Sequence, residues 1–445
     1  MHIHALSRKA VLQVAVILLG AAAPMARLLA QTSDTLTLPH AIELALANAP
    51  TLDQAKAVLQ ASEAHTRLVE NASSLRIDGG ASYTRIDPVP TVTLPLNGKD
   101  VTFGFAPNDN YEAAISIQKV LYDFGAQDAR VAATRSLESG AKDNLEQIRT
   151  SLAYQTALAY CSLSVIDESV RLQIVQRTIL EQSIGIASER ERLGAATNLE
   201  ELNTRVRIAQ IESQIADLQD SREKQEAQLR RLMGWGSRDR VLVSSNLSIA
   251  ESDANADALV EQALTHRPEL VVAHDQEASA KLQVESAKAS DRPYIAANVQ
   301  GGVKDGYFPN LTDPKINWAG TVRLAVPLFN GGRSDIQVEE AEANLHAAQS
   351  HTLELERSIG LEVQQAMADV RAAKKKLSLV EAQIAQATRA LKLTTTRYKN
   401  GAATNLEFLT AQSSLEQSET TQVTAKFAYE YSELQLQRAL GSRMW

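Results

Sequence analysis

The residue types that usually carry enzyme or metal chemistry match no catalytic or metal-binding motif in this 445-residue chain. The six histidines beyond residue 30 show no His-x-x-x-His or comparable ligand spacing. The single cysteine, Cys161, excludes a disulfide scaffold and a cysteine-rich metal site. Phosphate-binding loops, dinucleotide-binding glycine patterns and Gly-x-Ser-x-Gly elbows are also missing from the sequence. We therefore expect no catalytic residue, no metal and no cofactor, and the protein is not expected to be an enzyme.

The most specific signal is a repeated heptapeptide that contains a glycine and a glutamate. The sequence Gly-Ala-Ala-Thr-Asn-Leu-Glu occupies residues 194–200 and again residues 401–407, an offset of 207. Upstream, the similar segments 45–50 and 263–268 are separated by 218 residues instead. This pattern predicts an internal tandem duplication. The two offsets differ by 11 residues, which places an insertion of that size in the first copy between residues 50 and 121.

The composition favours close-packed helices and excludes several classes of protein. Hydrophobic residues make up 44% of the chain but aromatic residues only 4%, which is typical of helix-on-helix packing. A formal net charge of −8 without a basic stripe argues against a nucleic-acid-binding protein. Beyond the N-terminus no apolar run reaches 18 residues, so no membrane-spanning helix is expected.

Residues 1–30 have the pattern of a secretory signal peptide. Arg8 and Lys9 precede an apolar stretch over residues 10–23, and a small-residue segment follows. We expect cleavage after Ala30 and treat these residues as separate from the folded protein. A buried N-terminal helix is the alternative.

Long stretches without proline predict long helices. No proline occurs in residues 126–267 or in residues 328–445. Residues 126–192 alone would form a helix about 100 Å long. Such a rod needs partners of equal length, and two shorter helices over 51–75 and 198–233 would lie beside it in series. Apolar residues step by three and four positions in these stretches, as at Leu377, Val380, Ile384, Ala387 and Leu391.

Two short segments rich in proline, glycine and aromatic residues predict pairs of strands. They cover about residues 77–121 and 293–327. Apolar residues alternate with polar ones around Ile115 and Ile117. Strands of about ten residues are long enough to cross a bilayer. A soluble hairpin that joins helices is the alternative.

Four strands cannot close a barrel wide enough for transport, and open strand edges are not tolerated in lipid. A trimer would provide the missing strands.

Over about residues 35–441, the chain resembles the TolC-like outer-membrane efflux proteins. The segment 36–48, Leu-Thr-Leu-Pro-His-Ala-Ile-Glu-Leu-Ala-Leu-Ala-Asn, matches the start of that family. The sharpest match is Tyr-Lys-Asn-Gly at 398–401, which is followed by Leu406, Leu409, Ala411, Gln412 and Leu415. The signal peptide and the duplication complete the pattern.

The resemblance implies a mainly α-helical protein with a membrane β-barrel. Three chains would form a homotrimer with a 12-stranded barrel, four strands per chain, continuous with a long periplasmic α-helical coiled-coil barrel. The expected organisation is a signal peptide at 1–30, a first repeat at 31–234, a linker or equatorial segment at 235–257, a second repeat at 258–441 and a C-terminal tail at 442–445.

The resemblance also implies a passive exit duct in the outer membrane of a Gram-negative-type bacterium. An inner-membrane pump and a periplasmic adaptor would supply energy and substrate, and the barrel would contact outer-membrane lipid. Two alternatives stay open. One is the outer-membrane channel of a type I protein secretion system, and the other is a periplasmic coiled-coil scaffold without a pore.

The family's adaptors dock at the two helix-to-helix turns. The resemblance therefore implies adaptor contact at residues Gly194, Ala195, Thr197, Leu199, Gly401, Ala402, Thr404 and Leu406. Glycine at each turn also relieves the strain of reversing the chain, so ordinary tight turns are the alternative.

The resemblance further implies an aperture near Glu407 and Thr410 and a closed-state tether between Tyr398 and Glu200. Three Glu407 carboxylates near a trimer axis would attract cations, whereas a solvated surface glutamate is the alternative. In some members of the family an arginine strengthens this tether at the position that Ala403 occupies here, so this pore is expected to open more readily.

Overall fold

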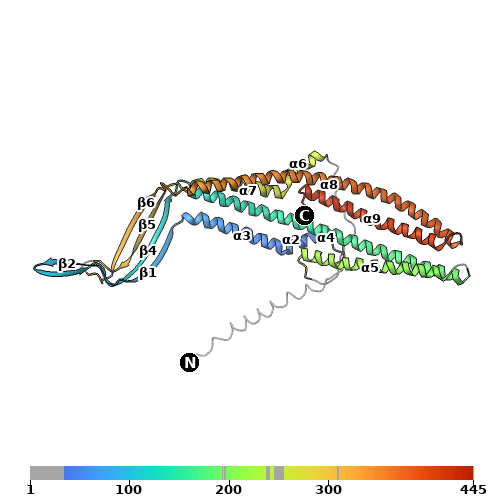
Figure 1. The fold of residues 1–445 in the computed structure, drawn as a ribbon, viewed down its shortest axis with the longest axis horizontal. Coiled ribbons are helices and arrows are strands. Elements are labelled where there is room, and N and C mark those ends of the chain that lie inside the picture. Colours follow the sequence, from blue (N-terminus) through green and yellow to red (C-terminus); the bar gives the residue numbers. More distant parts are fainter. Residues whose placement is uncertain are drawn as a thin grey trace, which may run out of the picture.

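The computed structural model describes residues 35–443, apart from residues 193, 195–196, 237–240, 245–254 and 308–309. The molecule is elongated, with strands at one end, helices along its length and two helix-to-helix turns at the other end (Figure 1). The predicted signal peptide at 1–30 lies outside the described residues, as do parts of the predicted linker and tail.

Two sets of four helices follow each other along the chain with closely matched lengths. The first set is α2 (Leu38–Asn48), α3 (Pro50–Glu70), α4 (Ala126–Arg192) and α5 (Asn198–Leu232). The second set is α6 (Ala256–His266), α7 (Pro268–Ala289), α8 (Arg333–Lys399) and α9 (Asn405–Ala439). Both α4 and α8 have 67 residues, and both α5 and α9 have 35.

The predicted single helix over residues 126–192 is confirmed. Proline is the first residue of α3 and α7 and the second residue of α2, where the missing backbone N–H does no harm. One boundary differs from expectation, because α3 ends at Glu70 and the chain continues as a 3-10 turn over Asn71–Ser73. Among the described residues, no helix is both long and apolar enough to cross a membrane.

Each long helix packs against shorter helices, as the length argument predicts. Helix α4 contacts α3 and α5, and α8 contacts α6, α7 and α9. Helix α4 also contacts α7 and α9, and these contacts join the two halves. Cys161 is fully buried beside Ala153, Ala157 and Leu434, and burial raises its pKa to about 12. It is therefore a small core residue with an unreactive thiol.

Four strands form one antiparallel sheet in the order β1-β4-β5-β6. Their bounds are Arg76–Arg85, Asp109–Tyr122, Tyr294–Lys304 and Lys315–Ala325. Each predicted strand pair contributes two neighbouring strands, and β4 pairs with β5 across the two halves. Within the described residues, β1 and β6 each have one edge without a strand partner.

A second hairpin, β2 (Thr91–Leu96) and β3 (Lys99–Gly104), was not expected. It extends beyond the four-stranded sheet (Figure 1). Asn97 and Gly98 both have positive φ at its turn, which is the geometry that an Asn-Gly hairpin turn requires. The hairpin lies inside the interval in which the sequence places the 11 additional residues.

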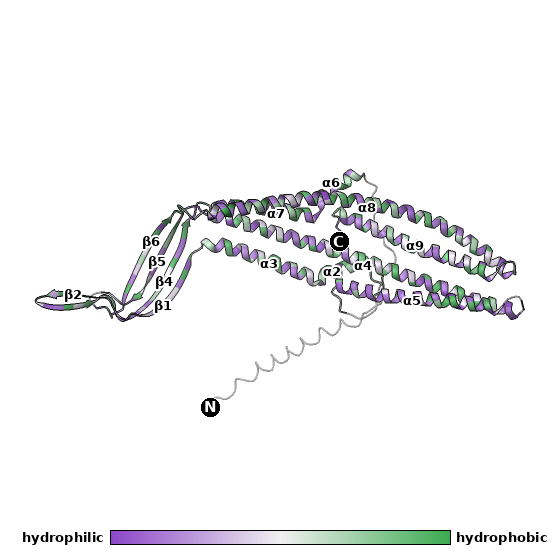
Figure 2. Cartoon of the chain, in the orientation of Figure 1, coloured by the Kyte–Doolittle hydropathy of each residue, from purple (hydrophilic) through white to green (hydrophobic). Residues whose placement is uncertain are grey.

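The sheet has one apolar and one polar face. Because side chains alternate along a strand, paired residues share a face. One row across the four strands is Gly79, Ile115, Gly301 and Trp318, and the adjacent row is Asp78, Ser116, Gln300 and Ala319. Figure 2 shows hydrophobic and hydrophilic residues interspersed along these strands. Such a sheet suits lipid on one side and water on the other.

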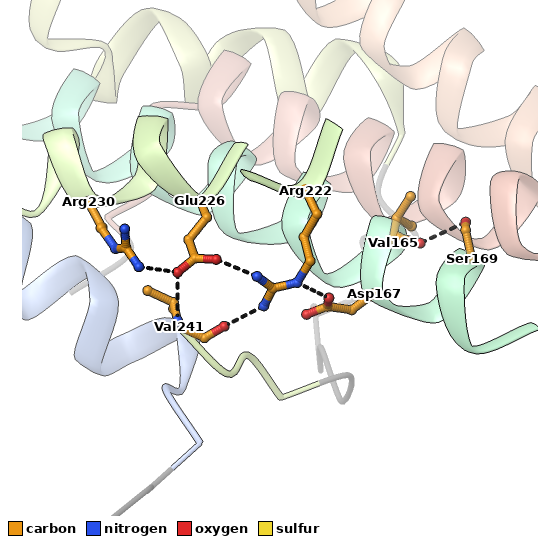
Figure 3. Close-up of polar contacts among 7 residues, drawn as sticks. All are labelled: Val165, Asp167, Ser169, Arg222, Glu226, Arg230 and Val241. Carbon is orange, nitrogen blue, oxygen red and sulfur yellow. Dashed lines mark hydrogen bonds and ion pairs between the residues drawn. The ribbon is translucent and has the colours of Figure 1, made fainter. Parts of the chain in front are cut away.

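A cluster of two buried and two partly buried charged side chains holds the linker segment against α4 and α5 (Figure 3). Arg222 of α5 donates to Asp167 of α4 at 2.6 Å, to Glu226, and to the carbonyl of Val241 at 2.7 Å. Glu226 accepts from Arg230 and from the backbone N–H of Val241 at 2.8 Å. We call these four charged residues the charge clasp. It satisfies both backbone groups of Val241 and so fixes the linker to α5.

The N-terminal segment joins the linker beside the charge clasp. Leu36 donates to the carbonyl of Leu242 at 2.7 Å and accepts from the N–H of Ser244 at 3.2 Å. The hydroxyl of the buried Tyr160 donates to the carbonyl of Leu36 at 2.7 Å. This junction lies midway along the long helices and ties the chain start and the linker to α4.

Candidate functional site

Two helix-to-helix turns lie side by side at the end of the molecule opposite the sheet (Figure 1). We call the α4–α5 turn with its flanking helix ends (residues 190–201) the first tip, and the α8–α9 turn with its flanking helix ends (residues 397–408) the second tip. Gly194 and Gly401 adopt φ values of 70° and 73°, a left-handed conformation that favours glycine. Nothing lies within 4 Å of a Cβ atom placed at either position. Glycine is therefore favoured at these two positions by the left-handed backbone conformation, and not by a lack of space for a side chain.

In the second tip, a capping box stabilises the N-terminus of α9. Thr404 accepts from the N–H of Glu407 at 3.2 Å, and the Glu407 carboxylate accepts from the N–H of Thr404 at 2.7 Å. These bonds to the ionised carboxylate hold the pKa of Glu407 below its ordinary value. Glu407 and Thr410 are both exposed and lie three residues apart on α9. The residues expected at the aperture thus share one solvent-facing side of this helix.

The first tip has no capping box. The Thr197 side chain makes no capping hydrogen bond. Glu200, the counterpart of Glu407, instead accepts a 2.8 Å hydrogen bond from the hydroxyl of Tyr398 at the end of α8. The structure therefore brings together the two residues that the resemblance implies as a tether, and their bond joins the two tips within one chain.

Tyr398 is the most enclosed side chain of the tips, at 1% exposed. Its ring stacks on Phe408 with centroids 5.2 Å apart, and its hydroxyl lies 3.5 Å from the Asn405 side-chain amide. Burial is the main cause that raises the pKa of Tyr398 above its ordinary value. The hydroxyl therefore stays protonated near neutral pH and can donate to Glu200.

Sequence reasoning missed three residues of this cluster. Phe408 and Asn405 follow the second turn, and Arg190 reaches across from α4 to lie over the Tyr398 ring at 4.3 Å. Ala403, where the resemblance places an arginine, is buried with Tyr398 and Phe408. An arginine four residues before each turn glycine, at 190 and 397, was the available sequence signal.

The residues expected to contact an adaptor are exposed wherever the structure describes them. Leu199 and Leu406 are 62% and 74% exposed although both are apolar. The other described positions on the surface are Gly194, Thr197, Gly401, Ala402 and Thr404. Ala195 lies outside the described residues. The tips therefore present small and apolar side chains to their surroundings.

Further polar contacts join the two helix pairs behind the tips. Arg207 of α5 donates to Glu416 of α9 at 2.6 Å. The buried Gln176 of α4 accepts from Gln412 and donates to Glu419, both on α9 and both at 2.5 Å. The seam between the pairs is hydrogen-bonded here, whereas apolar residues fill it near Cys161.

An open groove of about 820 Å³ lies between α5, α8 and α9. Its lining is mostly amide and hydroxyl side chains, which include Thr410, and Arg207 is the one charged residue among them. In the part of the chain that the structure describes, no three His, Cys, Asp or Glu residues gather to hold a metal ion.

Comparison with known proteins identifies the family. The profile of the family described as outer membrane efflux protein matches residues 41–235 and 259–442. The pyoverdine export outer membrane protein OpmQ of Pseudomonas putida is 24% identical over 71% of this chain and 67% of its own length. The outer membrane protein TolC of Salmonella enteritidis is 21% identical over 91% of this chain and 86% of its own length.

A solved structure shows the same fold. The outer membrane protein VceC of Vibrio cholerae superposes with a TM-score of 0.75 at 23% identity, covering 92% of this chain and 97% of that one. The CusC channel gives a TM-score of 0.76 at 19% identity, with 91% and 92% covered. The predicted fold class, a strand region of the barrel type continuous with a long helical region, is confirmed. On the family match, this chain belongs to the outer membrane efflux proteins.

Proposed function

We propose that this chain forms the passive exit duct of a tripartite efflux system in the outer membrane. An inner-membrane pump and a periplasmic adaptor would deliver small molecules, and the duct would conduct them outward. One observation carries the proposal: a two-faced sheet of bilayer-spanning length continues into helices of 67 residues that end in exposed turns. The names of relatives, which include pyoverdine export and cation efflux, support small substrates.

The working unit in this proposal is a homotrimer. Strands β1 and β6 each have a free edge among the described residues, and Trp318 and Ile316 on β6 are exposed apolar side chains. An open edge in lipid would leave backbone groups without partners. Pairing β6 of one chain with β1 of the next removes both edges, and three chains close the barrel. The matched helix lengths likewise support the internal duplication.

The tips close the duct and receive the adaptor in this proposal. The Tyr398–Glu200 bond, 2.8 Å long, would hold the two helix pairs together in the closed state. Three copies of Glu407, ionised and exposed, would ring the aperture beside Thr410 and favour cations. Exposed Leu199 and Leu406 would give adaptor hairpins an apolar contact at both tips.

Two measurements on detergent-extracted protein test the proposal. Light scattering is expected to give a trimer, and a planar bilayer is expected to give small, cation-selective openings. Glu407→Ala should lower the preference for potassium over chloride, because three negative charges leave the aperture. Glu212→Ala, at an exposed position along α5, should change nothing. A monomer that fractionates with the periplasm would contradict the duct and favour the scaffold alternative.

A further inference from the structure

We propose that Arg190 is a positioning residue. In the closed tip it holds both the Tyr398 ring and the Glu200 carboxylate in place. The inference rests on the proposed closing role of the Tyr398–Glu200 bond. It assigns the positive charge of that contact to α4, and not to the turn after Gly401, where this chain has Ala403.

The geometry places one guanidinium against both members of the bond. The Arg190 guanidinium carbon lies 4.3 Å from the centroid of the Tyr398 ring. Its Nη1 atom lies 3.8 Å from Oε2 of Glu200, the same oxygen that accepts from the Tyr398 hydroxyl. One oxygen of the Glu200 carboxylate thus lies within reach of both the Tyr398 hydroxyl and the Arg190 guanidinium.

Partial burial strengthens these contacts. The Arg190 and Glu200 side chains are 16% and 20% exposed, so water screens their attraction less than at an open surface. A guanidinium over an aromatic ring is attracted to the π face, and more strongly where both are desolvated. Arg190 therefore favours the arrangement in which Tyr398 lies against the first helix pair.

The position of Arg190 in the fold makes it a link between the two tips. It belongs to the last turn of α4, Glu200 belongs to the first turn of α5, and Tyr398 belongs to the last turn of α8. The neighbouring arginines contact residues of their own helix pairs. Arg192 pairs with Glu189 on α4, and Arg397 donates to the carbonyl of Ala402 in its own turn.

Because residue 403 is an alanine, the turn after Gly401 supplies no positive charge at this position. This residue is buried and packs with Tyr398 and Phe408. A small side chain there allows the aromatic pair to stack, with ring planes only 14° apart. The cluster therefore combines apolar side chains around the second turn, Ala403 and Phe408, with the charged Arg190 side chain of α4.

The test compares channel opening in single and double variants. In a planar bilayer, Arg190→Met should raise the open fraction of the trimer about twofold to fivefold, the ratio that one cation–π contact at a partly exposed site provides. Arg190→Lys, which keeps the charge, should restore most of the closed state. Arg192→Met removes a more exposed ion pair two residues away and should leave opening unchanged.

A double variant separates positioning from general stability. If Arg190 acts through Tyr398, adding Arg190→Met to Tyr398→Leu should cause no further opening. Independent, multiplicative effects in the double variant would overturn the inference, as would unchanged opening in Arg190→Met. Light scattering on each variant shows that the trimer is intact.

The outcomes also separate this inference from the proposed function. Opening that responds to Tyr398→Leu but not to Arg190→Met overturns the role of Arg190 alone. Opening that responds to neither overturns the closing bond itself, and the inference with it.

Discussion

The two tips share seven identical residues and use them differently. In the second tip, Glu407 turns back to cap its own helix through Thr404. In the first tip, Glu200 reaches the other helix pair and accepts from Tyr398. The backbone of the turns is alike, because both glycines adopt nearly the same left-handed φ. Identical local sequence therefore sets the turn, whereas the side-chain partners depend on what flanks it.

The flanking residues account for the difference. At the offset of 207, Tyr398 corresponds to Glu191 and Phe408 corresponds to Glu201. The second tip thus has an aromatic pair where the first has two acids, and the aromatic pair supplies the buried platform at the junction. One repeat provides the apolar surface and the other provides the acceptor.

A second contrast lies at the other end of the same helices. The charge clasp uses Arg222, Glu226 and Arg230 of α5. At the offset of 207, α9 has Tyr429, Glu433 and Gln437. The two arginines of the clasp belong to the first helix pair alone, so the linker is fixed to that pair by contacts that the second repeat does not reproduce.

Replacing Arg222 by its counterpart from the second repeat should have the largest effect. Arg222→Tyr leaves Glu226 and Asp167 without their shared guanidinium and should lower the free energy of unfolding by about 3–5 kcal/mol. Thermal unfolding of the detergent-solubilised protein measures this. Lys224→Ala removes an exposed ion pair on the same helix and should cost close to nothing. Equal losses in the two variants would contradict the clasp.

Replacing Tyr398 by its counterpart from the first repeat should have the next largest effect. Tyr398→Glu introduces the residue found at position 191, and it should destabilise the closed tip by about 3 kcal/mol. A buried aromatic side chain is lost, and a second carboxylate comes to lie beside Glu200. The reciprocal Glu191→Tyr changes a partly exposed site and should leave opening unaltered. Opening in both variants alike would contradict the asymmetry between the tips.

Removal of the cap should have a smaller and local effect. Thr404→Ala should cost about 1 kcal/mol, because it leaves the backbone N–H of Glu407 without its acceptor. Thr197→Ala, at the matching position of α5, should cost little since that side chain makes no capping bond. Deuterium uptake over the first turns of α5 and α9 tests the difference. Similar increases at both helices would show that the capping box is not specific to the second tip.

Acid should loosen the second tip through Glu407. The pKa of this carboxylate is lowered by the Thr404 backbone N–H, so its ionised form favours the folded cap. That contribution is present above the ordinary glutamate pKa and is lost as the pH falls through the lowered pKa. After deuterium uptake is corrected for the slower intrinsic exchange of amides in acid, protection over residues 401–410 should be lower at about pH 3.5 than at pH 6. In Glu407→Gln this pH dependence should be lost.

Much of the fold was predictable because it follows local rules. The proline-free stretches located the 67-residue helices, and the alternation around Ile115 located the sheet. The β2–β3 hairpin was missed although Asn97-Gly98 between alternating residues is a hairpin signal.

The side-chain contacts were less predictable, for a physical reason. Arg190 contacts Tyr398, and Arg222 contacts Asp167, across helices that are far apart along the chain. Both contacts depend on how the helices pack against each other, which no local pattern encodes. Tyr398 and Glu200 were identified through a resemblance to a family, and not through periodicity or spacing.

The most direct test of the account is the single-channel conductance of Tyr398→Phe in a planar bilayer, beside the parent protein. This variant keeps the ring against Arg190 and Phe408 and removes only the hydroxyl that donates to Glu200. Because the Tyr398–Glu200 bond is lost, we expect larger and longer openings from an intact trimer. Equal conductance in the variant and the parent would contradict the central claim that the bond between the two tips holds this duct closed.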